Sequence, residues 1–212
     1  MEVLVPFSTE SPKSRLEPVL SERERRDFAR AMAADVVEAI EAAGHHPHIL
    51  STGQIDVDVP VTVDERPLTD AVNARLSAHV DARGSDGGPE IAVVMADLAI
   101  ATPSVLERLF ETPGDVVIAP GRGGGTNAFV SRHPGFRVDY HGTSYLDHRE
   151  IAATVGADVC VVDSFRLATD VDEPADLVEV LTHGDGRART YLTDVGFTLQ
   201  TTDGRVSASR PE

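Results

Sequence analysis

The feature that most constrains the fold of this chain is the regular alternation of short apolar runs with segments of helical periodicity. Residues 91–95 form a continuous apolar run of the kind found in a central parallel strand, and residues 116–119 form another. Between such runs, apolar side chains recur every three or four positions, most clearly over residues 28–40. Strands that alternate with helices predict an α/β fold with a mostly parallel sheet flanked by helices.

The same patterns predict the elements in chain order. Strands are expected at residues 2–7, 48–51, 59–63, 91–95, 116–119, 126–131 and 158–162. Helices are expected at residues 21–44, 68–80, 103–110, 143–155 and 174–181. Ser21 and Glu24 have the spacing of a capping box at the start of the first helix, and Gly44 is placed to end it. Residues 8–16 and 81–89 are expected to be loops.

The 212 residues, of which 41% are hydrophobic, suffice for one globular domain, which we expect to span residues 1–212. A hairpin-like tail around Asp203-Gly204 is expected beyond about residue 183. No apolar run is long enough to span a bilayer, and the first residues lack the features of a signal peptide, so a cytoplasmic protein is expected. Cys160 is the one cysteine, which excludes a disulfide within the chain.

The charge of the chain is strongly acidic, with a formal net charge of −16. This argues against binding to nucleic acid or to an anionic membrane, since both require a basic face. Lys13 is the only lysine among 19 basic residues, and a surplus of carboxylates with so little lysine is typical of proteins adapted to high salt. A chain that has nearly dispensed with lysine has kept this one.

Three aspartates are candidates for holding a cation. Asp97 follows the apolar run 91–95, at the edge of the sheet where open α/β folds bind ligands, and its burial requires an arginine or a divalent cation nearby. Asp170 and Asp172 are two apart, so both can face the same side of an extended segment and share a hard cation such as Mg²⁺. The alternative for Asp97 and for Asp172 is that each caps a helix.

A glycine-rich segment, residues 121–125, follows a predicted strand and precedes Thr126 and Asn127. Glycines there allow positive φ and a close approach of the backbone to a ligand, and free N–H groups can hold phosphate or carboxylate oxygens. The alternative is a hairpin turn. The spacing matches neither a P-loop nor a dinucleotide-binding fingerprint.

Lys13 and Arg15 lie in the loop after the first strand, which should reach the same sheet edge as Asp97. Lysine is a compact charge suited to phosphate oxygens and arginine can bind them in a bidentate way, although such residues in loops are often only solvated. His141 and His148 flank Ser144 and can reach a ligand there. No pairing of a nucleophile with a base supports covalent catalysis.

In this order, these segments resemble the 2-phospho-L-lactate guanylyltransferase family of coenzyme F-420 biosynthesis, and more distantly the nucleotidyltransferases that activate sugars and molybdopterin. The resembling stretches are VPFSTESPKSRLEPVLS, DERPLTDAVNARL, VVMADLAI, GRGGGTNAFV, YHGTSYLDH and ATDVDEPADL. The resemblance implies a nucleotide-diphospho-sugar-transferase-like, Rossmann-like α/β fold. It also implies transfer of GMP from GTP to 2-phospho-L-lactate, with release of pyrophosphate, and a homodimer. Related members use phosphoenolpyruvate or 3-phosphoglycerate.

The resemblance also implies roles for individual residues. The residues expected to hold Mg²⁺ are Asp97, Asp170 and Asp172. Those expected to contact the triphosphate and support catalysis, together with Asp97, are Lys13 and Arg15. Those expected to bind the substrates are Asp70, Asn73, Gly124, Gly125, Thr126, Asn127, Gly142 and Ser144. His141 stands where the family often has glycine, so Gly142 is expected to take over its backbone contact.

Two other functions fit the same residues. A metal-dependent glycosyltransferase also uses D-x-D to hold a nucleotide sugar, but the Lys13 loop suits a triphosphate donor better. A non-catalytic nucleotide-binding domain would need neither the whole acidic set nor the retained lysine. No residue selects guanine over adenine by its own chemistry, so GTP follows from the resemblance alone.

Overall fold

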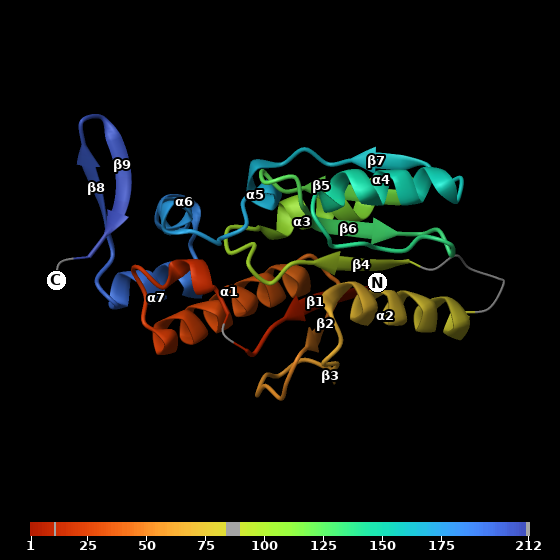
Figure 1. Cartoon of the computed structure of the whole chain (residues 1–212), viewed down its shortest axis with the longest axis horizontal. Helices are drawn as coiled ribbons and strands as arrows, with labels where there is room; N and C mark the ends of the chain where they lie inside the picture. Colours follow the sequence, from red (N-terminus) through yellow and green to blue (C-terminus); the bar gives the residue numbers. More distant parts are fainter. Residues whose placement is uncertain (11, 84–89, 211–212) are drawn as a thin grey trace.

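The protein is built around one central sheet (Figure 1). The structure is a computed structural model, and it describes residues 1–10, 12–83 and 90–210. The seven strands of the sheet lie in the order β3-β2-β1-β4-β6-β5-β7. Neighbouring strands are parallel except at β6, which runs antiparallel to both β4 and β5. In chain order the strands are β1 (Glu2–Phe7), β2 (His46–Ser51), β3 (Val61–Val63), β4 (Ile91–Val94), β5 (Val116–Pro120), β6 (Thr126–Ser131) and β7 (Val159–Val161). The predicted α/β fold with a mostly parallel sheet is confirmed.

Helices cover both faces of this sheet. The α-helices are α1 (Glu22–Ala42), α2 (Leu68–Arg83), α3 (Pro103–Glu111), α4 (Ser144–Thr154), α5 (Phe165–Ala168), α6 (Leu177–His183) and α7 (Arg187–Asp194). The short 3₁₀ helices are η1 (Ser14–Leu16) and η3 (Pro174–Asp176). Successive strand residues face opposite sides, so Val3 and Val5 join the core beneath α1 and α3 while Leu4 joins the core beneath α2 and α4.

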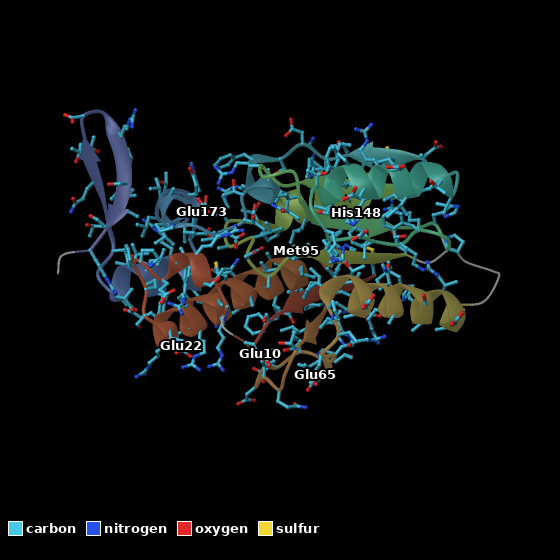
Figure 2. All side chains as sticks on the ribbon, viewed as in Figure 1. Glu10, Glu22, Glu65, Met95, His148 and Glu173 are labelled. Carbon is cyan, nitrogen blue, oxygen red and sulfur yellow. The ribbon has the colours of Figure 1, made fainter. Side chains whose placement is uncertain are left out.

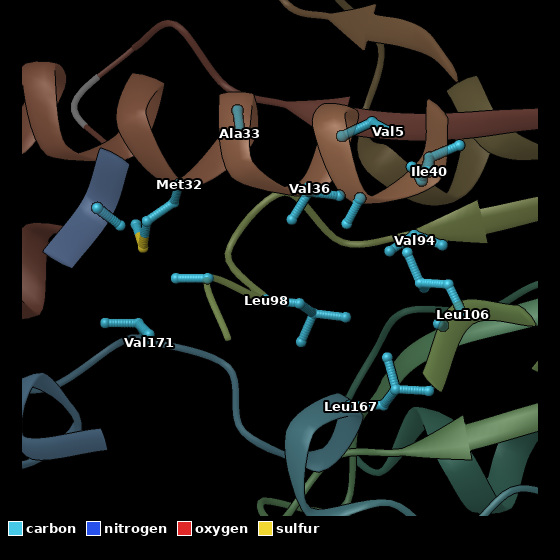
Figure 3. Packing of buried hydrophobic residues seen from close by; sticks show 14 of the residues in the cluster. Val5, Met32, Ala33, Val36, Ile40, Val94, Leu98, Leu106, Leu167 and Val171 are labelled. Atoms are coloured by element: carbon cyan, nitrogen blue, oxygen red, sulfur yellow. The ribbon is translucent and has the colours of Figure 1, made fainter. Parts of the chain in front are cut away.

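Helix α1 begins and is oriented as its sequence predicts. Ser21 and Glu24 form the expected capping box at its N-terminus. Its apolar stripe packs on the sheet, where Val36 and Ile40 lie on the side of Val94 and Met32 points toward Val171 in the larger core (Figure 3). This packing holds the loop between β1 and α1 at the carboxyl end of the central strands.

The antiparallel strand β6 results from the glycine-rich segment. Residues 121–125 turn the chain back at the end of β5, with the Gly121 N–H donating to the Gly125 carbonyl and Gly124 at φ 83°. The hairpin-turn alternative is therefore what the backbone forms here. The turn brings Asn127 beside the end of β4, where its carbonyl accepts from the Met95 N–H at 3.0 Å.

The C-terminal tail differs from the prediction in one element. Strands β8 (Thr198–Thr202) and β9 (Arg205–Ser209) form the expected hairpin, which is a separate two-stranded sheet at one end of the molecule (Figure 1). Before it, however, α7 is a helix where only a tail was expected. Its N-terminus is capped by Asp35 of α1, whose carboxylate accepts from the N–H groups of Arg187 and Ala188 at 2.7 and 2.9 Å. A cap from so far along the chain leaves no local signal.

The expected loop at residues 81–89 falls mostly outside the described residues, and its first three residues belong to α2. Over the described ranges, no helix has both the length and the apolar character needed to cross a membrane.

Candidate active site

A pocket of about 420 Å³ opens at the carboxyl ends of β3, β2, β1 and β4. These four strands are adjacent and parallel, so their ends meet at one edge of the sheet, as expected for a ligand site in this class of fold. The charged residues that line the pocket are Lys13, Arg15, Asp64, Arg66, Asp97 and Asp172. Apolar side chains make up much of the rest of its lining.

Lys13 ties two of the predicted aspartates together. Its Nζ donates to Oδ2 of Asp97 at 2.6 Å and to Oδ1 of Asp172 at 2.7 Å. Arg15 lies farther out, with Nη1 at 3.7 Å from Oδ2 of Asp172 and with most of its side chain exposed. The prediction that the lysine loop meets the edge of the sheet at Asp97 is confirmed.

The backbone presents Lys13 to these carboxylates in an unusual conformation. Lys13 has φ 56° and ψ 46°, in the left-handed region, and directly precedes η1. A residue with a Cβ bears a cost of roughly 1–2 kcal/mol in that conformation. The buried side chain of Leu16 anchors the turn, and the Leu16 N–H donates to the Lys13 carbonyl at 2.9 Å. Packing and the ion pairs hold Lys13 in this strained geometry.

The electrostatics of the cluster favour a charged lysine. Burial lowers the pKa of Lys13, but the carboxylates of Asp97 and Asp172 outweigh that effect, so the pKa lies above its usual value. Burial raises the pKa of Asp97, while the ammonium of Lys13 opposes this and the carboxylates of Asp172 and Asp170 add to it. Lys13 is thus the positive partner that the burial of Asp97 requires.

Of the three aspartates predicted to bind a cation, Asp97 and Asp172 are joined through Lys13, while Asp170 binds Asn127 instead. Oδ1 of Asp97 is buried and has no hydrogen-bond partner within the described residues. Asp170 accepts a hydrogen bond from Nδ2 of Asn127 at 3.1 Å. In the described part of the chain no group of three or more histidines, cysteines or carboxylates is set to hold a metal ion. The ammonium of Lys13 lies between Asp97 and Asp172.

The alternative of Asp172 as a helix cap is wrong. Glu173 is the N-cap of η3, and it forms a capping box with Asp176. Oδ2 of Asp176 also accepts from the N–H of Asp172 at 3.0 Å. The Asp172 carboxylate is therefore free to bind Lys13.

A second group of predicted residues joins the glycine turn to the start of α4. Oγ of Ser144 accepts from the Thr126 N–H at 3.0 Å, and the carbonyl of Gly124 accepts from the Tyr145 N–H at 3.2 Å. Thr126 and Ser144 are buried, and neither they nor Gly125 line the pocket. The structure therefore places these residues beside the aspartates but outside the cavity, with Asn127 and Asp170 as the connection.

His148 is a buried residue that supports this second group (Figure 2). Burial lowers its pKa to about 4, so the ring is neutral at neutral pH. Nε2 accepts from the Asp139 N–H at 3.0 Å, which leaves the proton on Nδ1, and Nδ1 donates to Oγ1 of Thr126 at 2.9 Å. In this contact Thr126 accepts, so its own hydroxyl hydrogen is not used in it.

The remaining predicted residues lie around the segment that precedes α4. The amide of Asn73 binds the backbone of Val138 through both its oxygen and its nitrogen, at 2.8 and 2.9 Å. Asp70 is exposed on the first turn of α2. His141 is exposed and bonded to the carboxylate of Asp139, and Gly142 has φ 60°. Asn73 thus positions the backbone, and the other side chains lie open to solvent.

Sequence reasoning missed Asp64 and Arg66, which line the pocket at the end of β3. Oδ1 of Asp64 accepts from Nε of Arg66 at 2.8 Å and Oδ2 accepts from Nη2 at 2.5 Å. A signal was available: Asp64 follows a predicted strand at the same sheet edge as Asp97.

Solved structures share the fold of this protein. One is described as a nucleotide-diphospho-sugar transferase of Desulfovibrio desulfuricans, with a TM-score of 0.72 at 15% identity, covering 91% of this chain and 94% of the other. Another is a nucleotidyl transferase of Methanothermobacter thermautotrophicus, with a TM-score of 0.57 at 16% identity, covering 92% and 99%. The fold is that of the nucleotidyl and nucleotide-diphospho-sugar transferases.

Sequence comparison then identifies the family. The model of the family described as "Guanylyl transferase CofC like" matches residues 1–210, and the chain belongs to this family. A 2-phospho-L-lactate guanylyltransferase of Halorubrum lacusprofundi is 60% identical, covering 99% of this chain and 100% of the relative. One of Halomicrobium mukohataei is 57% identical, covering 100% of both chains. The protein is therefore an enzyme of the nucleotidyltransferase class.

Proposed function

We propose that the protein transfers GMP from GTP to 2-phospho-L-lactate, giving lactyl-2-diphospho-5′-guanosine and pyrophosphate, in coenzyme F-420 biosynthesis. The observation that carries this proposal is the cluster of Lys13, Asp97 and Asp172 at a pocket formed by strand ends, in a chain of a guanylyl transferase family. Full-length relatives named for this reaction support the choice of acceptor.

The reaction requires little covalent chemistry from the protein. An oxygen of the acceptor's phosphate bonds to the α-phosphorus of GTP, and the bond from that phosphorus to the departing pyrophosphate oxygen breaks. The attacking oxygen is already ionised near neutral pH, so no protein base is needed. The task is to bring two polyanions together and to stabilise the charge on pyrophosphate. Lys13, which stays protonated, and the exposed Arg15 supply positive charge for this.

We propose that Asp97, Asp170 and Asp172 hold Mg²⁺. The donors are carboxylate oxygens, which suit this cation, and the buried Oδ1 of Asp97 has no competing hydrogen bond within the described residues. When bound, Mg²⁺ would neutralise charge and orient the reactants. In the structure, Lys13 neutralises two of these carboxylates, those of Asp97 and Asp172, which lets them stay close together.

The acceptor is assigned to the second group of residues. Thr126 and Ser144 lie at the turn formed by Gly124 and Gly125, and the Thr126 hydroxyl, which accepts from His148, has its own hydrogen available for a carboxylate or phosphate oxygen. Gly142 at the start of α4 completes this set. The proximity of Asn127 to Asp170 links acceptor and cation sites.

The deciding experiment measures pyrophosphate release in high salt with Mg²⁺, offering GTP or ATP with 2-phospholactate, phosphoenolpyruvate or 3-phosphoglycerate. We expect GTP with 2-phospholactate to give the highest kcat/KM. A higher kcat/KM with another acceptor would mean that this compound, and not 2-phospholactate, is the acceptor. The absence of GMP transfer to all three acceptors would refute the proposal. Transfer of sugar from a nucleotide sugar without pyrophosphate release would instead indicate a glycosyltransferase.

Asp97→Asn tests the cation assignment directly. We expect it to lower kcat by about 100- to 1000-fold because it removes a charged ligand from the reacting groups. Circular dichroism should show an unchanged fold. Near-normal guanylyl transfer by the Asp97→Asn variant would show that Asp97 is not a cation ligand.

We further propose that the enzyme is a homodimer, as the resemblance implies, with the β8–β9 hairpin in the interface. Leu199 and Val206 are about half exposed, and an isolated two-stranded hairpin is marginally stable. Light scattering should give the mass of a dimer for the natural chain. The double substitution Leu199→Glu with Val206→Glu should give a monomer, and a dimer that survives it would place the interface elsewhere.

A further inference from the structure

One end of the pocket carries a pair of charged side chains that the proposed reaction does not use. Asp64 and Arg66 line the cavity just after β3, while Asp97 and Lys13 line it after β4 and β1. The side chain of Asp64 is only 11% exposed, whereas that of Arg66 is 55% exposed. A nearly buried carboxylate therefore holds an arginine whose head remains open to the pocket.

The hydrogen bonds of this pair leave part of the guanidinium available. The carboxylate of Asp64 accepts one hydrogen bond from Nε and one from Nη2 of Arg66. It also accepts one from the Arg66 backbone N–H at 3.1 Å. Nη1 has no partner within the described residues, and Nη2 keeps a second hydrogen. Arg66 thus presents two donors side by side, in an orientation that the carboxylate fixes. Such a fork matches a ligand with two adjacent acceptors.

The order of strands places this fork at a distance from the reacting phosphates. From β4 to β3 there are three strand intervals, through β1 and β2, which amount to roughly 14 Å. Met95, at the end of β4, lies near the centre of the molecule, and Glu65, beside Arg66, lies at its lower edge (Figure 2). This span is comparable with the length of an extended nucleotide from its phosphates to its base.

The lining between the two ends suits a flat ring. Pro6 on β1 and Leu50 on β2, the strands between the two ends, line the pocket, as do Leu68 and Ala71 of α2. Apolar side chains can pack against both faces of a purine, while its edge points beyond them to Arg66. The charged groups of the pocket thus lie toward its two ends, where a nucleotide has its phosphates and its base edge.

We propose that Arg66, positioned by Asp64, recognises guanine by donating to O6 and N7 of the base. Guanine presents two adjacent acceptors on this edge, whereas adenine presents the N7 acceptor beside a 6-amino donor that would face an arginine donor. The pair therefore makes the site selective for GTP. This assignment rests on the proposed nucleotidyl transfer and adds to it the choice of base.

The test measures nucleotide binding by calorimetry, separately from pyrophosphate release, using GTP, ITP, ATP and 7-deaza-GTP. ITP retains O6 and N7 but lacks the 2-amino group, so the wild-type protein should bind ITP about as well as GTP. ATP should bind about 10- to 100-fold more weakly, and 7-deaza-GTP, which lacks the N7 acceptor, more weakly than GTP. A strong preference for GTP over ITP would overturn the assignment, as would equal binding of GTP and ATP.

Variants separate base recognition from general charge. Arg66→Lys keeps the charge but loses the fork, so it should reduce the ratio of GTP to ATP affinity to near one. Asp64→Asn weakens the orientation of Arg66 and should reduce the ratio partly. Arg23→Lys, at an exposed position on α1, and Glu65→Gln, beside the pair, serve as matched controls and should keep the wild-type ratio.

The outcomes also separate this inference from the proposed function. If Arg66→Lys weakens GTP and ATP equally, Arg66 binds phosphate and the inference is wrong. Base-selective binding without GMP transfer to any acceptor would leave the inference standing and refute the proposed function. GMP transfer to an acceptor, with no effect of Arg66→Lys on base selectivity, would support the proposed function and refute the inference.

Discussion

At the scale of single residues, the candidate site is built around one lysine held in a strained conformation between two carboxylates. The ion pairs of Lys13 with Asp97 and Asp172 are short and mostly buried, so the ammonium has little freedom. A point charge fits between two carboxylates, whereas a planar guanidinium is larger and needs a different approach. The choice of lysine is thus geometric as well as electrostatic.

Replacing Lys13 should separate charge from geometry. Lys13→Ala leaves Asp97 without its counter-ion and leaves Asp172 with only the more distant Arg15, so it should lower kcat/KM for GTP by about 100-fold or more. Lys13→Arg restores charge but not shape, so we expect a partial recovery, seen as a smaller loss in pyrophosphate release. Normal release by both variants would show that Lys13 does not contact the triphosphate.

His148 should make stability depend on pH. Its folded pKa of about 4 is below the ordinary value of 6.5, so between these values the unfolded chain binds a proton that the folded chain does not. Stability is then fully present above about pH 6.5 and falls as the pH decreases toward 4, by roughly 3 kcal/mol in total.

Denaturant unfolding at several pH values and constant salt measures this effect. His148→Gln removes the titrating ring, so the free energy of unfolding should vary less between pH 6.5 and 4 than in the wild type. An identical pH dependence in both proteins would mean that other groups produce it.

At the scale of elements, sequence patterns predicted the features that depend on residues close together in the chain. The capping box of α1 and the strand β4 follow from residues that are close in sequence. The sequence also predicted that Lys13 and Asp97 meet, since both follow strands that end at one edge. It did not predict α7, whose cap comes from Asp35, nor the Asp64–Arg66 pair, whose role depends on which strands are adjacent. It also did not show that Lys13 would lie between Asp97 and Asp172, two of the predicted cation ligands.

The cap of α7 can be tested by substitution. Asp35→Ala removes one exposed and one partly buried hydrogen bond to helix N–H groups and should lower the free energy of unfolding by about 1–3 kcal/mol. Glu38→Ala breaks only an exposed ion pair with Arg187 on the same helix and should cost less than about 1 kcal/mol. Equal effects in denaturant unfolding would indicate that the cap contributes no more than a surface charge.

At the scale of the whole molecule, the net charge of −16 makes the folded chain sensitive to salt. Like charges on a compact surface repel one another over a Debye length of about 10 Å at 0.1 M salt and about 3 Å at 1 M. Concentrated salt therefore removes most of this repulsion.

We expect the melting temperature to rise steadily as potassium chloride is increased from about 0.1 M to the molar range. Calorimetry measures the shift. Because the Lys13 cluster is mostly buried, its ion pairs should be screened less than those on the surface, and the cluster should survive at high salt. A melting temperature independent of salt would show that the acidic surface does not limit stability.

The burial of Lys13 has a practical consequence for chemical labelling. Apart from the N-terminal amine, it is the only primary amine in the chain, and its side chain is 12% exposed and ion-paired with two carboxylates. An amine-reactive dye should therefore attach almost entirely to the N-terminus in the folded state. Any label found on Lys13 would report that the two carboxylates had released it.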